Sequence, residues 1–180
     1  MKKIILLFAV AIATTTIACS KSESEPGIPG GPKTSVPEEL TGNWMYGNFS
    51  MTEYWSQDPS EYLGPGVEMA FAFTFNSNGT YTQYFTASTV MSGVVTYQQS
   101  VTQGMVEVNT ASKTIITHPS KTHYKRTSNG HVVEERDLTK EEVSGNTTYT
   151  YTTGTESNGT EALYLTLSGT PDALTFLKQE

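Results

Sequence analysis

The sequence predicts an all-β fold, and three observations carry that prediction. Apolar residues alternate with small or polar residues along most of the chain after residue 40, most clearly in residues 67–75. The tripeptide Ser-Asn-Gly lies between β-like segments at residues 77–79, 128–130 and 157–159. Asn-Gly favours tight hairpin turns, because both residues tolerate a positive φ. Short strands with frequent turns therefore indicate a closed antiparallel barrel or a sandwich of about 8–10 strands.

The strands are rich in threonine and tyrosine, which fits pleated surfaces. They are predicted at residues 43–54, 67–75, 80–85, 90–101, 105–109, 113–118, 122–127, 131–138, 147–153, 161–167 and 173–178. Little helix is expected. Residues 36–40 favour one turn, with Pro37 near its start and acidic residues after it. Residues 138–143 carry a capping-box pattern, with a charged loop as the equal alternative.

The N-terminus has the order of a secretory signal peptide. Lys2 and Lys3 precede an uncharged apolar segment, residues 4–13, and small residues lead to Cys19. As a helix, residues 4–18 would span about 22 Å, short of the roughly 30 Å hydrocarbon core of a bilayer. We therefore expect residues 1–18 to be removed on export.

Cys19 is the only cysteine of the chain, so no disulfide can form within it. Thr16-Ile17-Ala18-Cys19 resembles the bacterial lipobox, although Leu usually stands where Thr16 does. The resemblance implies acyl chains on Cys19, and two or more chains make membrane anchoring stable. The partner expected first is therefore a membrane.

Residues 19–37 are rich in Gly, Pro and Ser and are predicted to be a flexible tether before a domain at residues 38–180. The segment from Ser20 to Glu25 loosely resembles the acidic export signal of Bacteroidota surface lipoproteins. The expected location is the cell envelope, with the anchor in the outer membrane. The sequence fits a domain on the periplasmic side of that membrane and equally a domain exposed on the cell surface.

The charge of the mature chain argues against two classes of partner. The full chain has 11 basic and 18 acidic residues. Loss of Lys2 and Lys3 with the signal leaves nine basic residues and a net charge of −9. This balance excludes nucleic acid and electrostatic adhesion to anionic lipid as expected partners. The basic residues gather between Lys113 and Lys140, which predicts two differently charged faces or a half that attracts cations.

Two motifs in the first half of the domain carry a resemblance. Leu-Thr-Gly-Asn-Trp at residues 40–44 precedes Phe-Ala-Phe-Thr-Phe-Asn-Ser-Asn-Gly-Thr-Tyr at residues 71–81. Together they resemble the lipocalin-like domains of Bacteroidota lipoproteins. The resemblance implies an up-and-down barrel with an internal cavity, and a Gly42–Trp44 motif that closes one end. In that family a basic residue of the last strand often lies beside the tryptophan, and Lys178 is the candidate.

Groups for catalysis or metal binding are sparse in the sequence. His118 and His123 are separated by Pro119, and their odd spacing places them on opposite faces of a regular strand. We expect His118, His123 and His131 to be surface residues and expect no metal, no cofactor and no enzymatic activity. Glu-Glu pairs are adjacent in sequence and are therefore poor acid/base partners.

The aromatic residues are the most informative group. Tyr54, Trp55 and Tyr62 surround a loop-like stretch, residues 56–60. In the lipocalin arrangement the first long loop covers the open mouth of the barrel, so these three residues are predicted to line or gate a ligand cavity. The alternative is a loop held to the barrel by ordinary packing.

Two functions follow. The first is an envelope binding protein for a small apolar ligand, acting without catalysis. The alternative is a barrel packed throughout, which would act as a structural or interaction partner of an envelope protein complex. A cavity of a few hundred Å³ would favour the first function and a filled interior the second.

Overall fold

The structure is a computed structural model that describes residues 31–56, 67–143 and 145–179. These residues form one 3₁₀ turn and nine antiparallel strands in a single ring-like sheet, so the all-β prediction is confirmed. The elements are η1 (Glu38–Leu40), β1 (Gly42–Tyr46), β2 (Val67–Phe75), β3 (Thr80–Met91), β4 (Val94–Asn109), β5 (Thr114–Ser128), β6 (His131–Asp137), β7 (Thr147–Thr155), β8 (Glu161–Leu167) and β9 (Ala173–Gln179).

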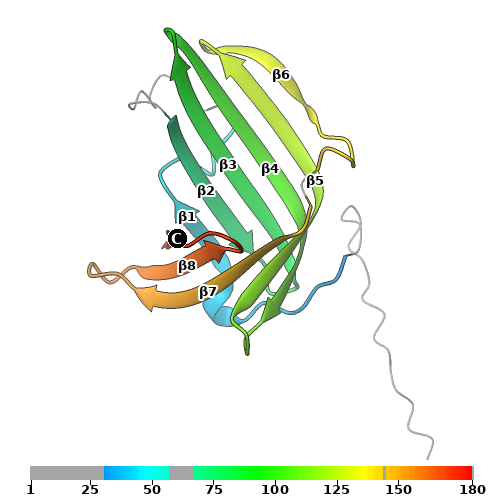
Figure 1. Ribbon diagram of the computed structural model, residues 1–180, viewed down its shortest axis with the longest axis vertical. Coiled ribbons are helices and arrows are strands. Elements are labelled where there is room, and N and C mark those ends of the chain that lie inside the picture. The colour runs from blue at the N-terminus through cyan, green and yellow to red at the C-terminus, as the bar shows by residue number, and fades with distance from the viewer. Residues whose placement is uncertain (1–30, 57–66, 144, 180) are drawn as a thin grey trace, which may run out of the picture.

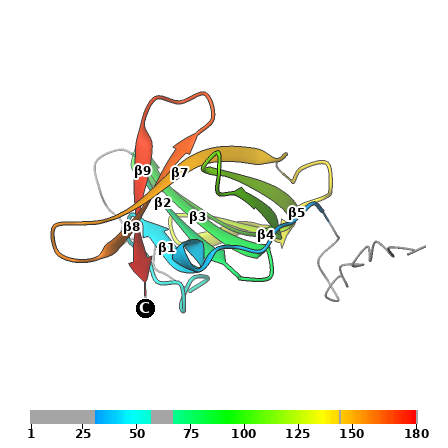
Figure 2. The ribbon, with the colours of Figure 1, turned by 90° about the horizontal axis from the view of Figure 1, so that it is seen from below.

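The sheet closes because β5 has two different partners along one of its edges. Its first part, Thr114–Thr117, pairs with β7, whereas His123–Ser128 pairs with β6. Its other edge pairs with β4 along nearly its whole length. The ring therefore runs β1-β2-β3-β4-β5-β7-β8-β9 and returns to β1 (Figure 2). Strand β6 lies outside this order and pairs with the second part of β5.

The two ends of the molecule differ. We call the end at η1 the lower end and the end at the β3–β4 and β5–β6 turns the upper end, as drawn in Figure 1. The long strands β3, β4 and β5 reach beyond the ring at the upper end, where β6 lies beside them (Figure 1). The short strand β1 and the strands β7–β9 belong to the lower part.

The three Ser-Asn-Gly turns are confirmed. They connect β2 to β3, β5 to β6 and β7 to β8. The glycine of each turn has a positive φ, at Gly79 (83°), Gly130 (79°) and Gly159 (88°). This left-handed conformation has no steric cost for glycine, which explains why the tripeptide marks the turns.

A fourth turn lies where the sequence predicted the strand 90–101. Ser92 and Gly93 have φ of 51° and 77° and connect β3 to β4. Strand β3 therefore continues past residue 85, and β4 joins the predicted strands 90–101 and 105–109. The boundary was wrong because Ser-Gly is a weaker turn signal than Asn-Gly.

Strand β5 likewise joins two predicted strands, 113–118 and 122–127, and passes through Pro119. Proline cannot donate a ladder hydrogen bond and is normally confined to edges or bulges. Here the register between β4 and β5 shifts between Gln103 and Gly104. An added Cβ on Gly104 would clash with the His118 carbonyl oxygen and lie 2.9 Å from the Pro119 Cα. Glycine at position 104 therefore permits the two backbones to approach closely.

The predicted strand 43–54 is wrong in its second half. Strand β1 ends at Tyr46, and Gly47 has φ +84°, which directs the chain out of the ladder. Residues 51–56 form turns, with a hydrogen bond from the Ser56 N–H to the Glu53 carbonyl (3.0 Å). The aromatic residues near Tyr54 alternate as they would in a strand, but they lie in a loop and pack against the outer face of the sheet.

The short helical predictions have different outcomes. Residues Glu38–Leu40 form the predicted turn, η1. At Thr139 the capping-box contact exists, because its N–H donates to Glu142 Oε2 (2.8 Å), but the segment is a charged turn and no helix follows.

The wall of the ring has a core on each face. Its interior is filled by large side chains from all eight ring strands and from the segment before β1. They are Val36, Leu40, Trp44, Phe73, Phe75, Tyr81, Val106, Ile115, Tyr151, Leu163, Leu165 and Phe176. The opposite face of β1–β4 carries a second cluster of Met45, Ala70, Ala72, Tyr84 and Val101, covered by Phe49, Met51, Tyr54 and Trp55.

The folded part begins before the predicted end of the tether at Pro37. Thr34 donates its N–H to the Val106 carbonyl (3.1 Å), and Val36 donates to the Ser77 carbonyl (3.2 Å). Val36 is buried. Thr34 therefore lies beside β4 and Val36 beside the β2–β3 turn, whereas the predicted signal peptide, Cys19 and residues 20–30 lie outside the described residues.

Candidate functional site

The lower end is closed around Trp44, the tryptophan of the predicted Gly42–Trp44 motif. Its side chain is 1% exposed, and its indole Nε1–H donates to the Leu40 carbonyl (2.8 Å). Gly42 supplies the preceding backbone bend, with φ +115°. The Lys178 Nζ lies 5.3 Å from the Trp44 ring centroid, so the last strand places a cation beside the tryptophan.

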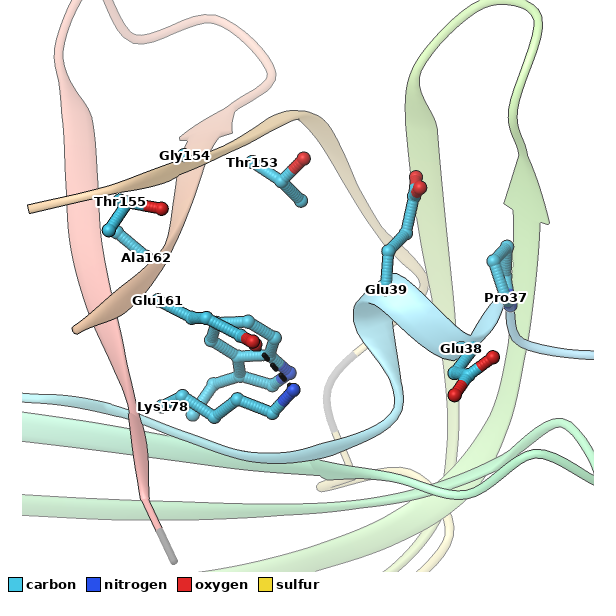
Figure 3. A pocket seen from close by; sticks show the side chains of 10 residues that line it. Pro37, Glu38, Glu39, Thr153, Gly154, Thr155, Glu161, Ala162 and Lys178 are labelled. Carbon is cyan, nitrogen blue, oxygen red and sulfur yellow. Dashed lines mark hydrogen bonds and ion pairs between the residues drawn. The ribbon is translucent and has the colours of Figure 1, made fainter. Parts of the chain in front are cut away.

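A wide crevice of about 690 Å³ lies next to this lower end (Figure 3). Its lining is polar and charged, with Glu38 and Glu39 on one side and the Lys178–Glu161 ion pair (2.5 Å) on the other. Glu39 also pairs with Lys113 at 3.6 Å. An open crevice lined by paired charges is poorly suited to an apolar ligand, because that ligand would desolvate the charges.

The upper opening of the ring holds an apolar cavity of about 330 Å³, which we call the mouth cavity. It is lined by Phe71 and Phe73 of β2, Tyr149 of β7, Leu165 and Leu167 of β8, Leu174 and Phe176 of β9, and Thr170 and Asp172 between β8 and β9. Burial raises the pKa of Tyr149.

The shortness of β1 explains why the mouth cavity exists. Tyr46 is the last residue of β1 and pairs with Phe71, while the β1–β9 pairing extends only from Asn43 to Met45. Above that point β2 and β9 have no strand between them. The inward side chains of both strands therefore face an open space at the edge of the interior core.

A second cavity, of about 250 Å³, lies on the β3–β4–β5 side of the same interior. Hydroxyl groups dominate its wall, so we call it the hydroxyl cavity. Its lining residues are Tyr81, Gln83, Phe85, Ser100, Thr102, Thr117, Pro119, Thr122, Tyr124, Leu138, Gly145 and Thr147. Thr102 and Thr122 are register partners across β4 and β5, and their hydroxyls are hydrogen-bonded at 3.0 Å.

Tyr54 and Trp55 do not reach either cavity. Tyr54 is 3% exposed in the outer cluster, and its hydroxyl is hydrogen-bonded to the Phe85 carbonyl and the Ser100 backbone. Burial raises the pKa of Tyr54. Trp55 packs edge-on against His123, and its carbonyl accepts from Lys125 Nζ (2.7 Å). This placement corresponds to the alternative of a loop held by ordinary packing, and Tyr62 lies outside the described residues.

The histidines are kept apart. His118 Nε2 lies 2.6 Å from Glu107 Oε1, while His123 contacts Asp137 (2.8 Å) and Glu135 (3.6 Å). His131 is exposed at the start of β6. Among residues 31–56, 67–143 and 145–179, no group of His, Cys, Asp and Glu has the arrangement of a metal site.

The basic segment between Lys113 and Lys140 is largely neutralised by acidic neighbours. Arg136 forms two contacts with Glu142 (2.7 and 2.8 Å) and one with Glu134 (3.0 Å). Its guanidinium lowers the pKa of Glu142 to about 2. Arg126 also reaches Glu134, at 3.3 Å. These pairs favour the interpretation of a structural charged face over a surface that attracts ions.

Sequence reasoning missed most residues of the mouth cavity. Alternation in Leu163, Leu165 and Leu167 marks an inward face, but alternation cannot separate a filled interior from a cavity. The cavity could have been predicted only from the early end of β1 at Tyr46. That end depends on the positive φ of Gly47.

Comparisons of the chain with protein-family models, with curated proteins and with solved structures find no match. In the part of the chain that the structure describes, no helix combines the length and apolar character needed to cross a membrane.

Proposed function

We propose that this chain is an exported, lipid-anchored envelope protein whose lipocalin-like barrel binds a small apolar ligand without catalysis. Cys19 would carry the acyl chains and residues 20–33 would separate the barrel from the membrane. The sequence resemblance supports the anchor and the lipocalin-like assignment.

The mouth cavity is the observation that carries the binding role. Its volume of about 330 Å³ falls at the lower end of the range of known ligand pockets, and most of its wall is aromatic or aliphatic. Leu167 and Leu174 remain 42% and 36% exposed at its rim. A bound apolar molecule would remove these surfaces from water, and each Å² of apolar surface buried stabilises the complex by about 25 cal/mol.

A titration of the purified protein with the neutral fluorescent probe N-phenyl-1-naphthylamine tests the proposal. We expect saturable binding that Leu174→Glu weakens at least tenfold, because the carboxylate would be desolvated in the cavity. Val132→Glu is the matched control, since Val132 is 54% exposed on β6, away from the cavity. Absence of saturable binding, or equal loss in both variants, would contradict the proposal.

A second function, an interaction with an envelope protein, is favoured by the upper hairpins. Met91 is 71% exposed at the β3–β4 turn, and Val132 and Val133 are 54% and 50% exposed next to the β5–β6 turn. Asn129 joins the two turns through hydrogen bonds to the Val95 N–H and carbonyl (both 2.8 Å). Both hairpin turns lie at the same end of the molecule (Figure 1), so these exposed apolar residues belong to one end.

Photocrosslinking in the source cells tests this second function. A photoreactive residue at position 91 should give one discrete adduct that the same residue at the exposed position 141 does not give. Equal adduct patterns at the two positions would exclude a specific contact at the hairpins.

A further inference from the structure

The two interior cavities are lined by neighbouring residues of the same inner wall, because Phe71 and Phe85 are register partners on β2 and β3. Phe71 of the mouth cavity contacts Phe85 of the hydroxyl cavity, with ring centroids 5.0 Å apart. Phe73 and Tyr81 form a second pair at 6.4 Å. On β7, Tyr149 lines the mouth cavity and Thr147 lines the hydroxyl cavity. A ligand that extends out of the mouth cavity along this wall would therefore next meet the residues of the hydroxyl cavity.

The hydroxyl cavity has free hydrogen-bonding capacity. The Thr102–Thr122 pair uses one hydroxyl proton in its mutual bond. Each threonine hydroxyl provides one donor and two acceptor lone pairs, so this pair retains one donor and several acceptors toward the cavity. Tyr124 adds a phenol, whose O–H can donate one further hydrogen bond.

The charge around the cavities selects against an anionic ligand. None of the residues that line the hydroxyl cavity carries a side-chain cation. The guanidiniums of Arg126 and Arg136 are occupied by Glu134 and Glu142. Asp172, at the mouth cavity, would repel a carboxylate. An ionised ligand would thus lose hydration and gain no counter-charge.

We infer that the ligand is an uncharged amphiphile, with an apolar part in the mouth cavity and a hydroxyl-bearing end against Thr102 and Thr122. This inference rests on the proposed binding function and deepens it, since it names the chemical class of the ligand. A fatty acid, whose carboxylate needs a cation, is the class that the site disfavours.

Competition against N-phenyl-1-naphthylamine by three compounds with the same alkyl chain tests the inference. Decane-1,2-diol should displace the probe better than decanol, and decanol better than decanoate at pH 7. The step from decanol to the diol should be about fivefold, which corresponds to one hydrogen bond of about 1 kcal/mol. The step from decanoate to decanol should be at least as large, because the carboxylate loses hydration and gains no counter-charge.

The variant Thr102→Val, Thr122→Val removes both hydroxyls with little change in shape. It should abolish the advantage of the diol over decanol and leave probe affinity within twofold of the unsubstituted protein. The matched control is Thr150→Val, Thr166→Val, a register pair on β7 and β8 outside both cavities. The control should keep the advantage of the diol.

The outcomes separate this inference from the proposed function. If the probe does not bind, the proposed function itself fails. If the probe binds but decanoate competes as well as the diol, or the diol advantage survives in the Thr102/Thr122 variant, the inference is wrong and the binding function stands. Circular dichroism and the probe affinity together show whether the variant is folded.

Discussion

The lower and upper parts of the barrel share the long strands β3, β4 and β5, yet only the lower part is a closed and filled ring. At the lower end eight strands enclose Trp44, Phe73 and their neighbours. At the upper end β7, β8 and β9 are absent and the inward faces of the long strands are partly exposed (Figure 1). Strand length causes the difference, because β1 has five residues and β4 has 16.

A barrel with this division can be stable although its interior contains cavities. The closed part supplies the buried apolar surface that holds the fold, so the open part need not be filled. Both interior cavities lie at the border between the two parts, where strands lose a neighbour. Substitutions in the lower part should therefore affect stability, and substitutions at the border should affect binding.

The largest effect is expected from Phe75→Ala in the closed part. Phe75 is 2% exposed and stacks on Phe73 with ring centroids 5.3 Å apart. Its truncation should lower the free energy of unfolding by about 3–5 kcal/mol, through lost burial and a new cavity. Urea denaturation measures this change. Met91→Ala, at a 71% exposed position of the upper end, should stay within about 0.5 kcal/mol. Similar losses of unfolding free energy in the two variants would contradict the claim that the closed part carries the stability of the fold.

Gly104→Ala should be the next most damaging change, at about 2–3 kcal/mol, because the new methyl group would overlap the His118 carbonyl. Position 104 lies at the bulge where β4 and β5 pass from the closed to the open part. Gly145→Ala serves as the control, since an added Cβ there meets nothing within 4 Å. Thermal unfolding of both variants gives the answer, and an unperturbed melting temperature for Gly104→Ala would show that the strands can separate locally.

Alkaline pH should destabilise the protein through its buried tyrosines. Burial raises the pKa of Tyr54 on the outer face and of Tyr81 inside the ring from an ordinary value of 10.0. Above about pH 10 the unfolded chain releases these protons and the folded chain retains them, so stability falls as pH rises. The expected slope is about 1.4 kcal/mol per pH unit for each such tyrosine. The midpoint of urea denaturation, measured from pH 8 to pH 11.5, gives this slope. A midpoint that does not change with pH would contradict the raised pKa values of these two tyrosines.

Tyr54→Phe should have the smallest effect of the series, about 1–2 kcal/mol, because it removes a hydroxyl bonded to backbone groups of β3 and β4 and leaves the ring packing in place. It should also reduce the alkaline slope. Binding of N-phenyl-1-naphthylamine should be unchanged, since Tyr54 lies on the opposite face of the wall from both cavities. Loss of probe binding in a folded Tyr54→Phe protein would restore the gate hypothesis.

The all-β fold and most turns could be predicted from the sequence because their causes are local. Alternation separates the side chains of β2 that point into the ring from those on its outer face, and Gly79, Gly130 and Gly159 mark turns that need a positive φ. The joining of strands across Pro119 was not predictable in the same way. It depends on Gly104, which is distant in sequence and close only across the ladder.

The candidate site was harder to predict than the fold. Tyr54 and Trp55 looked like residues at a cavity because they are aromatic and lie in a loop, but the sequence does not say on which face of the wall a loop folds. The mouth cavity results from the early end of β1 at Tyr46. Its residues are ordinary inward positions of β2, β7, β8 and β9, which become a cavity only because no neighbouring strand covers them.

The central claim is that a ligand binds at the border between the closed and open parts. Methyl-resolved NMR of the purified protein, titrated with decane-1,2-diol, tests it most directly. We predict that the largest shifts fall on Leu165, Leu167 and Leu174, at the mouth cavity. Shifts concentrated on Met45 and Met51 of the outer cluster, or no saturable shifts at all, would contradict the account.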